Sequence, residues 1–149
     1  MTINFLSQSI EDTNKIAARF AGGKICKLEK NCVVLLMGEV GAGKTTFVRC
    51  FSENYNLAQM VTSPTYTIVN EYDNHAFSIA HIDLYRLNST EELQEIGLED
   101  VIRRNDITFI EWPELSLPVL NFRTIQVQIQ QGEDENIRKF IFGVADGKN

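Results

Sequence analysis

Residues Gly38–Thr45 form the segment of the sequence whose residue types and spacing point most directly to chemistry. They read Gly-Glu-Val-Gly-Ala-Gly-Lys-Thr, which matches the pattern G-x-x-x-x-G-K-S/T of a phosphate-binding loop. The glycines allow successive backbone N–H groups to point at one anion. In such a loop Lys44 reaches the β- and γ-phosphates of a nucleotide, and the Thr45 hydroxyl is placed to bind Mg²⁺. The motif therefore predicts a site for a nucleoside triphosphate and magnesium.

Two acidic residues stand where a phosphate-binding loop requires them, at the ends of apolar segments. Asp83 closes Ile79–Ile82, and Glu111 closes Ile107–Ile110. Nucleotide hydrolases of this type hold the metal with an acid at the end of a neighbouring buried strand. Glu111 follows the more apolar segment, so we expect it to join Thr45 in the magnesium shell. Asp83 is then the candidate that positions or polarises the attacking water.

Other side chains near these acids admit a functional and a structural interpretation. Ser63–Thr65 lies where many nucleotide hydrolases sense the γ-phosphate, but a plain turn fits equally well. Trp112 directly follows Glu111 and could exclude water from the site, although a core tryptophan fits as well. Arg86 could face the site or the solvent. His81 has no metal-ligand spacing and is expected to be a structural residue of its strand.

The identity of the nucleotide follows by elimination. No N-K-x-D or T-K-x-D segment, which would read guanine, is present in the sequence. We therefore expect ATP, with ADP as its product, rather than GTP.

Composition limits the class of protein and its partners. The chain has 149 residues, of which 44% are apolar and 23% charged, which is typical of one globular domain spanning residues 1–149. Its net charge of −6 disfavours direct binding of nucleic acid, which usually requires a basic surface. The three cysteines form no C-x-x-C pair, so neither zinc nor redox chemistry is indicated. Without a signal-peptide pattern or a long apolar run, we expect a cytoplasmic protein that does not enter a membrane.

The elements that must position these residues can be read from hydrophobic periodicity. The helices are expected from Ser9 to about Gly22, from Lys44 to about Glu53, after a capping box at Ser89–Glu92, and over Leu98–Arg103. The strands are expected at Val33–Met37, Tyr66–Tyr72, Phe77–Ile82, Ile107–Ile110, and as a hairpin around Ile125–Ile129 and Phe140–Val144. The fold class is therefore α/β, a three-layer sandwich like that of the phosphate-loop nucleotide hydrolases. Its sheet is expected to be parallel at the centre with antiparallel strands at an edge.

Four motifs in succession resemble the TsaE family, the ATPase subunit of bacterial tRNA threonylcarbamoyladenosine (t6A) biosynthesis. These motifs are Gly38–Phe47, Ser63–Thr67 (Ser-Pro-Thr-Tyr-Thr), His81–Leu87 (His-Ile-Asp-Leu-Tyr-Arg-Leu) and Glu111–Pro113 (Glu-Trp-Pro). The resemblance covers essentially the whole chain. Glu39 stands where the family more often has Asp, and Val40 where it often has Leu. Both positions contribute backbone groups, so these two differences do not affect the expected binding of an anion by the loop.

The resemblance implies a specific role. Members of the family bind ATP with Mg²⁺ and hydrolyse it slowly alone. They act with TsaD and TsaB, whose complex transfers a threonylcarbamoyl group to adenosine 37 of tRNA. Hydrolysis is implied to reset that complex, so contact with tRNA would be indirect.

The resemblance also implies roles for individual residues. It places Thr45 and Glu111 in the metal shell, Asp83 and Ser63–Thr65 among the nucleotide-sensing residues, and Thr13 near the adenosine. The positions implied to bind the cofactor are Thr13, Gly38, Glu39, Val40, Gly41, Ala42, Gly43, Lys44, Thr45, Thr46 and Trp112.

Two other functions use the same loop. A small-molecule kinase would use Asp83 to bind an acceptor hydroxyl and Arg103–Arg104 as a lid. A regulatory module would bind ATP as a switch without hydrolysing it, although two acids at strand ends speak against this function.

Overall fold

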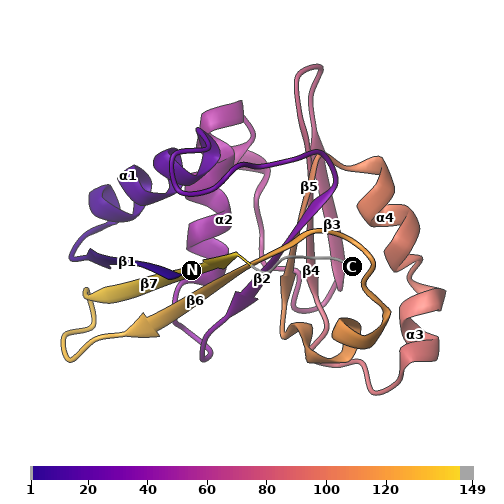
Figure 1. The fold of residues 1–149 in the computed structure, drawn as a ribbon. Coiled ribbons are helices and arrows are strands. Elements are labelled where there is room, and N and C mark those ends of the chain that lie inside the picture. Colours follow the sequence, from indigo (N-terminus) through magenta and orange to yellow (C-terminus); the bar gives the residue numbers. More distant parts are fainter. Residues whose placement is uncertain (1, 145–149) are drawn as a thin grey trace.

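The computed structural model describes residues 2–144, so Met1 and residues 145–149 of the expected domain lie outside the described residues. One seven-stranded sheet forms the centre of the described chain (Figure 1). Its strands are β1 (Thr2–Ser7), β2 (Cys32–Met37), β3 (Val69–Asp73), β4 (Ser78–Asp83), β5 (Ile107–Glu111), β6 (Thr124–Gln131) and β7 (Arg138–Val144). The helices are α1 (Ile10–Ala21), α2 (Lys44–Ser52), α3 (Thr90–Glu95) and α4 (Leu98–Arg104), with 3-10 segments η1 (Glu53–Tyr55), η2 (Ala58–Met60) and η3 (Pro113–Val119).

The strand order is β1-β7-β6-β2-β5-β4-β3. The four central strands β6, β2, β5 and β4 are parallel to their neighbours. Parallel pairing requires a crossover connection between the two strands of each pair. The remaining strands are antiparallel: β3 pairs with β4 at one edge, and β7 and β1 follow β6 at the other. The predicted α/β class is confirmed, and antiparallel strands close both edges of the sheet.

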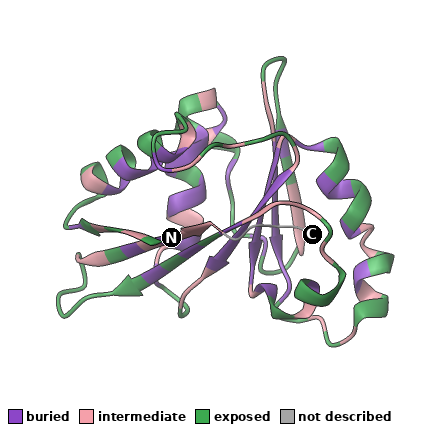
Figure 2. Cartoon of the chain, in the orientation of Figure 1, coloured by how far each residue is buried: buried purple, intermediate pink, exposed green. Residues whose placement is uncertain are grey.

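Helices cover both faces of the sheet and form a three-layer sandwich. In β2, Val34 and Leu36 pack into the core beneath α1 and α2, whereas Val33 and Leu35 pack into the core beneath α3 and α4. This double burial explains why every position of the strand is apolar. Figure 2 shows the buried residues concentrated along the central strands and the inner sides of the helices.

The predicted helix starts are present. Ser9 caps α1 by accepting a 3.1 Å hydrogen bond from the backbone N–H of Asp12. The capping box of α3 joins Ser89 and Glu92 as the sequence indicates. Among the described residues, no helix is both long and apolar enough to span a lipid bilayer.

Two local expectations were incomplete. The edge strand β1 was not predicted, because its half-buried residues give only a short alternation that is indistinguishable from loop. The strand expected at Tyr66–Tyr72 begins only at Val69, because Ile68 has a left-handed φ of 69° and its N–H bonds back to Pro64 O at 2.8 Å. A β-branched residue rarely adopts this conformation. The turn at Ile68 keeps Ser63–Thr65 out of the sheet.

Candidate functional site

The carboxyl ends of three neighbouring parallel strands bring the predicted residues together. The loop Gly38–Thr45 follows β2, while Asp83 and Glu111 are the last residues of β4 and β5 and are register partners. These residues surround a cavity of about 430 Å³, which we call the acidic cavity. Its lining consists of Val40, Gly41, Gly43, Lys44, Thr45, Thr46, Ser63, Thr65, Asp83, Tyr85, Glu111 and Trp112.

Two glycines give the loop its shape. A Cβ added at Gly38 would lie 2.7 Å from the carbonyl oxygen of Ile129, so only glycine allows the chain to turn so close to β6. Gly43 has a left-handed φ of 106° at the N-cap of α2, a conformation that glycine adopts without strain. The loop therefore enters α2 with its backbone facing the acidic cavity, as a phosphate-binding loop does.

Lys44 lies at the base of this cavity and is only 7% exposed. Its ammonium donates hydrogen bonds to the carbonyl oxygens of Gly38 and Glu39, and it lies 4.4 Å from the centre of the Trp112 ring. These contacts place one buried positive charge between the loop and the aromatic wall. Gly38 and Glu39, which were predicted to bind the cofactor, do not line the acidic cavity.

Asp83 occupies an environment that disfavours its charged form. Burial raises the pKa of the Asp83 carboxyl above its usual value, and this effect outweighs a hydrogen bond accepted from the N–H of Tyr85 at 2.9 Å. The neighbouring Glu111 carboxylate raises the pKa of Asp83 further. Because a weakly acidic carboxyl is a better proton acceptor, the environment suits a group that handles a proton.

Glu111 is held differently. Its Oε2 lies 2.5 Å from Nε2 of His81, whose side chain is fully buried. The Glu111 side chain itself is 7% exposed, on the wall of the acidic cavity. Thus two carboxylates on adjacent strands have distinct partners.

The outer part of the acidic cavity is aromatic and polar. Trp112 has a left-handed φ of 53° directly after β5, and its ring, in the cavity lining, lies 5.1 Å from that of Tyr85. On the other side, the hydroxyls of Ser63 and Thr65 are 2.7 Å apart. Trp112 is therefore part of the cavity wall rather than a core residue.

The side chains that line the acidic cavity fit a magnesium ion bound together with a nucleotide better than a metal ion bound by protein ligands alone. Within residues 2–144, no cluster of three or more His, Cys, Asp or Glu side chains could hold a metal. Two carboxylates and the Thr45 hydroxyl do line the same cavity. Mg²⁺ is usually bound through one or two carboxylates together with phosphate oxygens of a substrate. The residues therefore fit a metal that arrives with a nucleotide.

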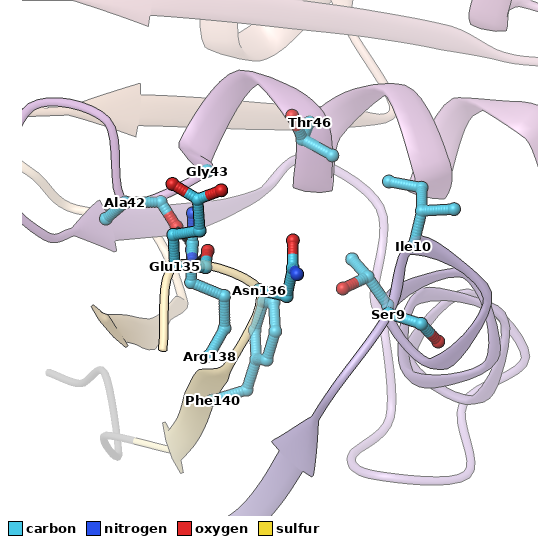
Figure 3. A pocket seen from close by; sticks show the side chains of 10 residues that line it. Ser9, Ile10, Ala42, Gly43, Thr46, Glu135, Asn136, Arg138 and Phe140 are labelled. Carbon is cyan, nitrogen blue, oxygen red and sulfur yellow. Dashed lines mark hydrogen bonds between the residues drawn. The ribbon is translucent and has the colours of Figure 1, made fainter. Parts of the chain in front are cut away.

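Thr13 does not line the acidic cavity. It lines a second space of about 220 Å³, the hairpin cavity, between the start of α1, the loop and the turn that joins β6 to β7. Figure 3 shows Glu135, Asn136, Arg138 and Phe140 on the hairpin side, with Ser9 and Ile10 opposite and Thr46 on α2. The Thr13 hydroxyl lies 2.7 Å from that of Ser7. Gly43 and Thr46 line both cavities, so the two spaces adjoin the same turn of the loop.

The hairpin side of this cavity was missed by sequence reasoning. The hairpin itself was predicted, but no local pattern indicates that its turn folds back against the loop. Arg138 makes that connection, because its Nε donates a 2.8 Å hydrogen bond to the carbonyl oxygen of Ala42.

Other candidate arginines lie elsewhere. Arg86 donates a 2.7 Å hydrogen bond to the carbonyl oxygen of Tyr66 and does not line the acidic cavity. Arg103 pairs with Glu99 at 2.8 Å, and Arg104 pairs with Glu71 at 2.6 Å. Both arginines lie in the last turn of α4, just before β5 begins, and therefore at the end of the strands opposite the loop. They do not form the lid that the kinase alternative required.

Comparison with known proteins identifies the family. Residues 7–140 match the family model described as "Threonylcarbamoyl adenosine biosynthesis protein TsaE". The tRNA threonylcarbamoyladenosine biosynthesis protein TsaE of Rickettsia bellii (strain RML369-C) is 35% identical over 130 residues, which cover 87% of this chain and 90% of that protein. The protein of the same name from Haemophilus influenzae (strain ATCC 51907 / DSM 11121 / KW20 / Rd) is 39% identical over 121 residues, covering 81% and 77%.

A solved structure supports the same assignment. The structure described as "Crystal structure of Bacillus subtilus YdiB" matches with a TM-score of 0.72 and 26% sequence identity, covering 97% of this chain and 86% of that chain. The residues matched by the family model include the linings of both cavities and strands β2 to β6. The chain belongs to the TsaE family.

Proposed function

We propose that this chain binds ATP with Mg²⁺ and hydrolyses it as the ATPase component of tRNA t6A biosynthesis. One observation supports the proposal above all others: Lys44, Thr45, Asp83 and Glu111 line one cavity at the carboxyl edge of the parallel strands. Sequence spacing predicted each of them separately. Their convergence is what a phosphate-loop hydrolase requires.

Each residue has a task that follows from its position. Loop N–H groups and Lys44 bind the phosphates, and Thr45 and Glu111 hold Mg²⁺. When bound, this ion neutralises phosphate charge and orients the terminal phosphate. Asp83 orients a water molecule and accepts its proton, for which its raised pKa is suited.

The nucleoside end of ATP is assigned to the hairpin cavity. This space adjoins the loop at Gly43 and Thr46, so a nucleotide can pass along the loop from one cavity to the other. Thr13 and Phe140 line it with a hydroxyl and an aromatic ring. A small, partly apolar space of this kind suits a purine better than a further phosphate.

Slow turnover by the isolated chain follows from the charges around the acidic cavity. Among the described residues that line it, Lys44 is the only cation. Phosphate-loop enzymes that lack an arginine at the terminal phosphate gain roughly 10³–10⁵ in rate when a partner supplies one. We assign the partner role to TsaD and TsaB, and the net charge of −6 is consistent with contact with proteins rather than with tRNA.

The test is ADP release by the purified chain, alone and with increasing TsaD–TsaB. The proposal predicts weak Mg²⁺-dependent hydrolysis that rises with the partner complex. ADP release that instead depends on an added small-molecule acceptor would favour the kinase function. Nucleotide binding without ADP release at saturating partner would favour a regulatory switch.

A further inference from the structure

His81 is fully buried, and its Nε2 lies 2.5 Å from Oε2 of Glu111. We propose that His81 is a positioning residue that holds the Glu111 carboxylate in the orientation that Mg²⁺ requires. This inference rests on the proposed function, in which Glu111 belongs to the metal shell. It assigns His81 a task in the site, whereas the sequence alone indicated a structural residue of β4.

The register of the sheet places His81 behind the metal-binding carboxylate. His81 pairs with Phe109, and Asp83 pairs with Glu111 on the neighbouring parallel strand. Alternate residues of a strand share a face, so all four side chains lie on the face covered by α2. The ring of Phe109 packs 5.1 Å from that of Phe51 in α2. His81 does not line the acidic cavity, so it can act on a bound nucleotide only through Glu111.

The hydrogen bonding of the ring indicates which nitrogen carries the proton. Among the described residues, Nδ1 of His81 has no hydrogen-bond partner, whereas Nε2 contacts the carboxylate. A neutral imidazole has one N–H donor and one acceptor nitrogen. Placing the proton on Nε2 makes a charge-assisted bond to Glu111 and leaves only a lone pair unpaired. Placing it on Nδ1 would bury an N–H without an acceptor and leave the carboxylate without a donor.

The consequence is a carboxylate with one fixed oxygen and one available oxygen. Oε2 of Glu111 is bound by His81, and no hydrogen bond joins Oε1 to any residue within 2–144. Removal of the Nε2–H donor would release a buried carboxylate to rotate. Hydrogen-bond partners that orient metal ligands typically change metal affinity or activity by 10- to 100-fold when they are mutated.

Two substitutions distinguish a role of His81 in positioning Glu111 from a role in core packing. His81→Gln places an amide N–H near the position of Nε2, whereas the shorter amide of His81→Asn cannot reach Glu111. The two variants differ by one methylene and carry the same polar group. Thr108→Val is the matched control, because Thr108 is also fully buried, lacks a partner for its hydroxyl among residues 2–144, and lies on β5 facing the opposite core.

The experiment uses the fluorescence of Trp112, the single tryptophan of the chain, which lines the acidic cavity. Each variant is titrated with ATP in the presence of EDTA, and then with Mg²⁺ at fixed ATP. Thermal melting of each variant is recorded in parallel. His81→Asn is expected to raise the Mg²⁺ concentration at half-maximal signal roughly 10- to 100-fold while ATP affinity in EDTA stays near wild type. His81→Gln and Thr108→Val are expected to keep the wild-type Mg²⁺ dependence.

A folded His81→Asn variant with wild-type Mg²⁺ dependence would overturn the inference. Equal loss of ATP binding in EDTA and in Mg²⁺ would also overturn it, because that result indicates a structural role. If His81→Asn does not fold while His81→Gln folds, loss of Mg²⁺ dependence in the Gln variant would contradict the proposal. Failure of the wild-type chain itself to bind ATP in a Mg²⁺-dependent manner would refute the proposed function rather than the task of His81.

Discussion

Arg138 Nε donates a 2.8 Å hydrogen bond to the carbonyl oxygen of Ala42, and this contact joins the start of β7 to the loop Gly38–Thr45. The same guanidinium lies 3.5 Å from the carbonyl oxygen of Gly41. Two carbonyls of the loop are therefore directed toward Arg138. Because the C=O and the N–H of one peptide group point in opposite directions, these two carbonyls direct the N–H groups of Ala42 and Gly43 to the other side of the loop, where we propose that the phosphates bind.

Arg138→Ala should weaken ATP binding by about 10-fold, since it removes a charge-assisted hydrogen bond of about 1.5 kcal/mol that shapes the loop. Calorimetric titration with ATP and Mg²⁺ measures this change. Lys139→Ala is the control, because Lys139 is the exposed neighbour on the same strand. Equal affinities in the Arg138 variant and the control would exclude a role for Arg138 in shaping the loop.

Lys44→Ala should abolish useful ATP binding and leave the fold intact. Among residues 2–144, the ammonium makes hydrogen bonds only to the loop's own carbonyls, so its loss removes no contact there between secondary-structure elements apart from that with the Trp112 ring. Each charge-assisted bond to phosphate is worth about 1.5–3 kcal/mol, so affinity should fall at least about 10-fold. ATP titration and thermal melting are measured together. Lys30→Ala, at an exposed position, should bind ATP normally, and normal binding by Lys44→Ala would contradict the loop assignment.

Asp83→Asn should slow hydrolysis far more than it weakens binding. The amide can still accept the hydrogen bond from Tyr85 N–H but cannot accept a proton from water. Loss of general-base catalysis typically costs about 10²–10⁴ in rate. The comparison of ATP affinity with turnover tests this. Weak Mg·ATP binding with little loss of turnover per bound nucleotide would mean that Asp83, and not Glu111, belongs to the metal shell.

The same substitution should change how stability depends on pH. Burial raises the folded-state pKa of Asp83 above its ordinary value of 3.8, so its contribution to the free energy of unfolding is complete below that value. The contribution is lost as the pH rises through the raised pKa, because the folded state must then bury a carboxylate. Near neutral pH, Asp83→Asn should therefore melt above the wild type. Melting curves at decreasing pH should converge toward pH 3.8, and a difference that grows on acidification would contradict the sign.

The sequence carries most of the information about the fold because local patterns coincide with the elements. Short segments of the sequence are enough to predict the uniform burial of β2, the caps at Ser9 and Ser89, and the alternation of buried and exposed residues in β6 and β7. The turn at Ile68 could not be predicted, because its left-handed conformation contradicts the preference of a β-branched residue. It is held by a local hydrogen bond to Pro64 O and by a tertiary hydrogen bond from the N–H of Asp83 to Ile68 O at 2.9 Å.

The candidate site, like the fold, has one part that local sequence patterns predict and one part that they do not. Lys44, Thr45, Asp83 and Glu111 follow from spacing and strand ends, since the carboxyl ends of parallel strands must meet. Arg138 does not, because it reaches Ala42 across 96 positions of the sequence and no short motif records that contact. The roles of these residues in binding and hydrolysis stay predictions.

Hydrolysis of ATP in the acidic cavity is tested most directly by ADP release as a function of Mg²⁺ concentration, measured for the wild type, Glu111→Gln and the exposed neighbour variant Glu114→Gln. The wild type should release ADP slowly, and this release should disappear in EDTA. Glu111→Gln should need about 10-fold more Mg²⁺ for half-maximal release, as is typical when a metal site loses a group on which it depends. Glu114→Gln should match the wild type. Release that is identical in all three proteins, or that persists in EDTA, would contradict hydrolysis of ATP in the acidic cavity.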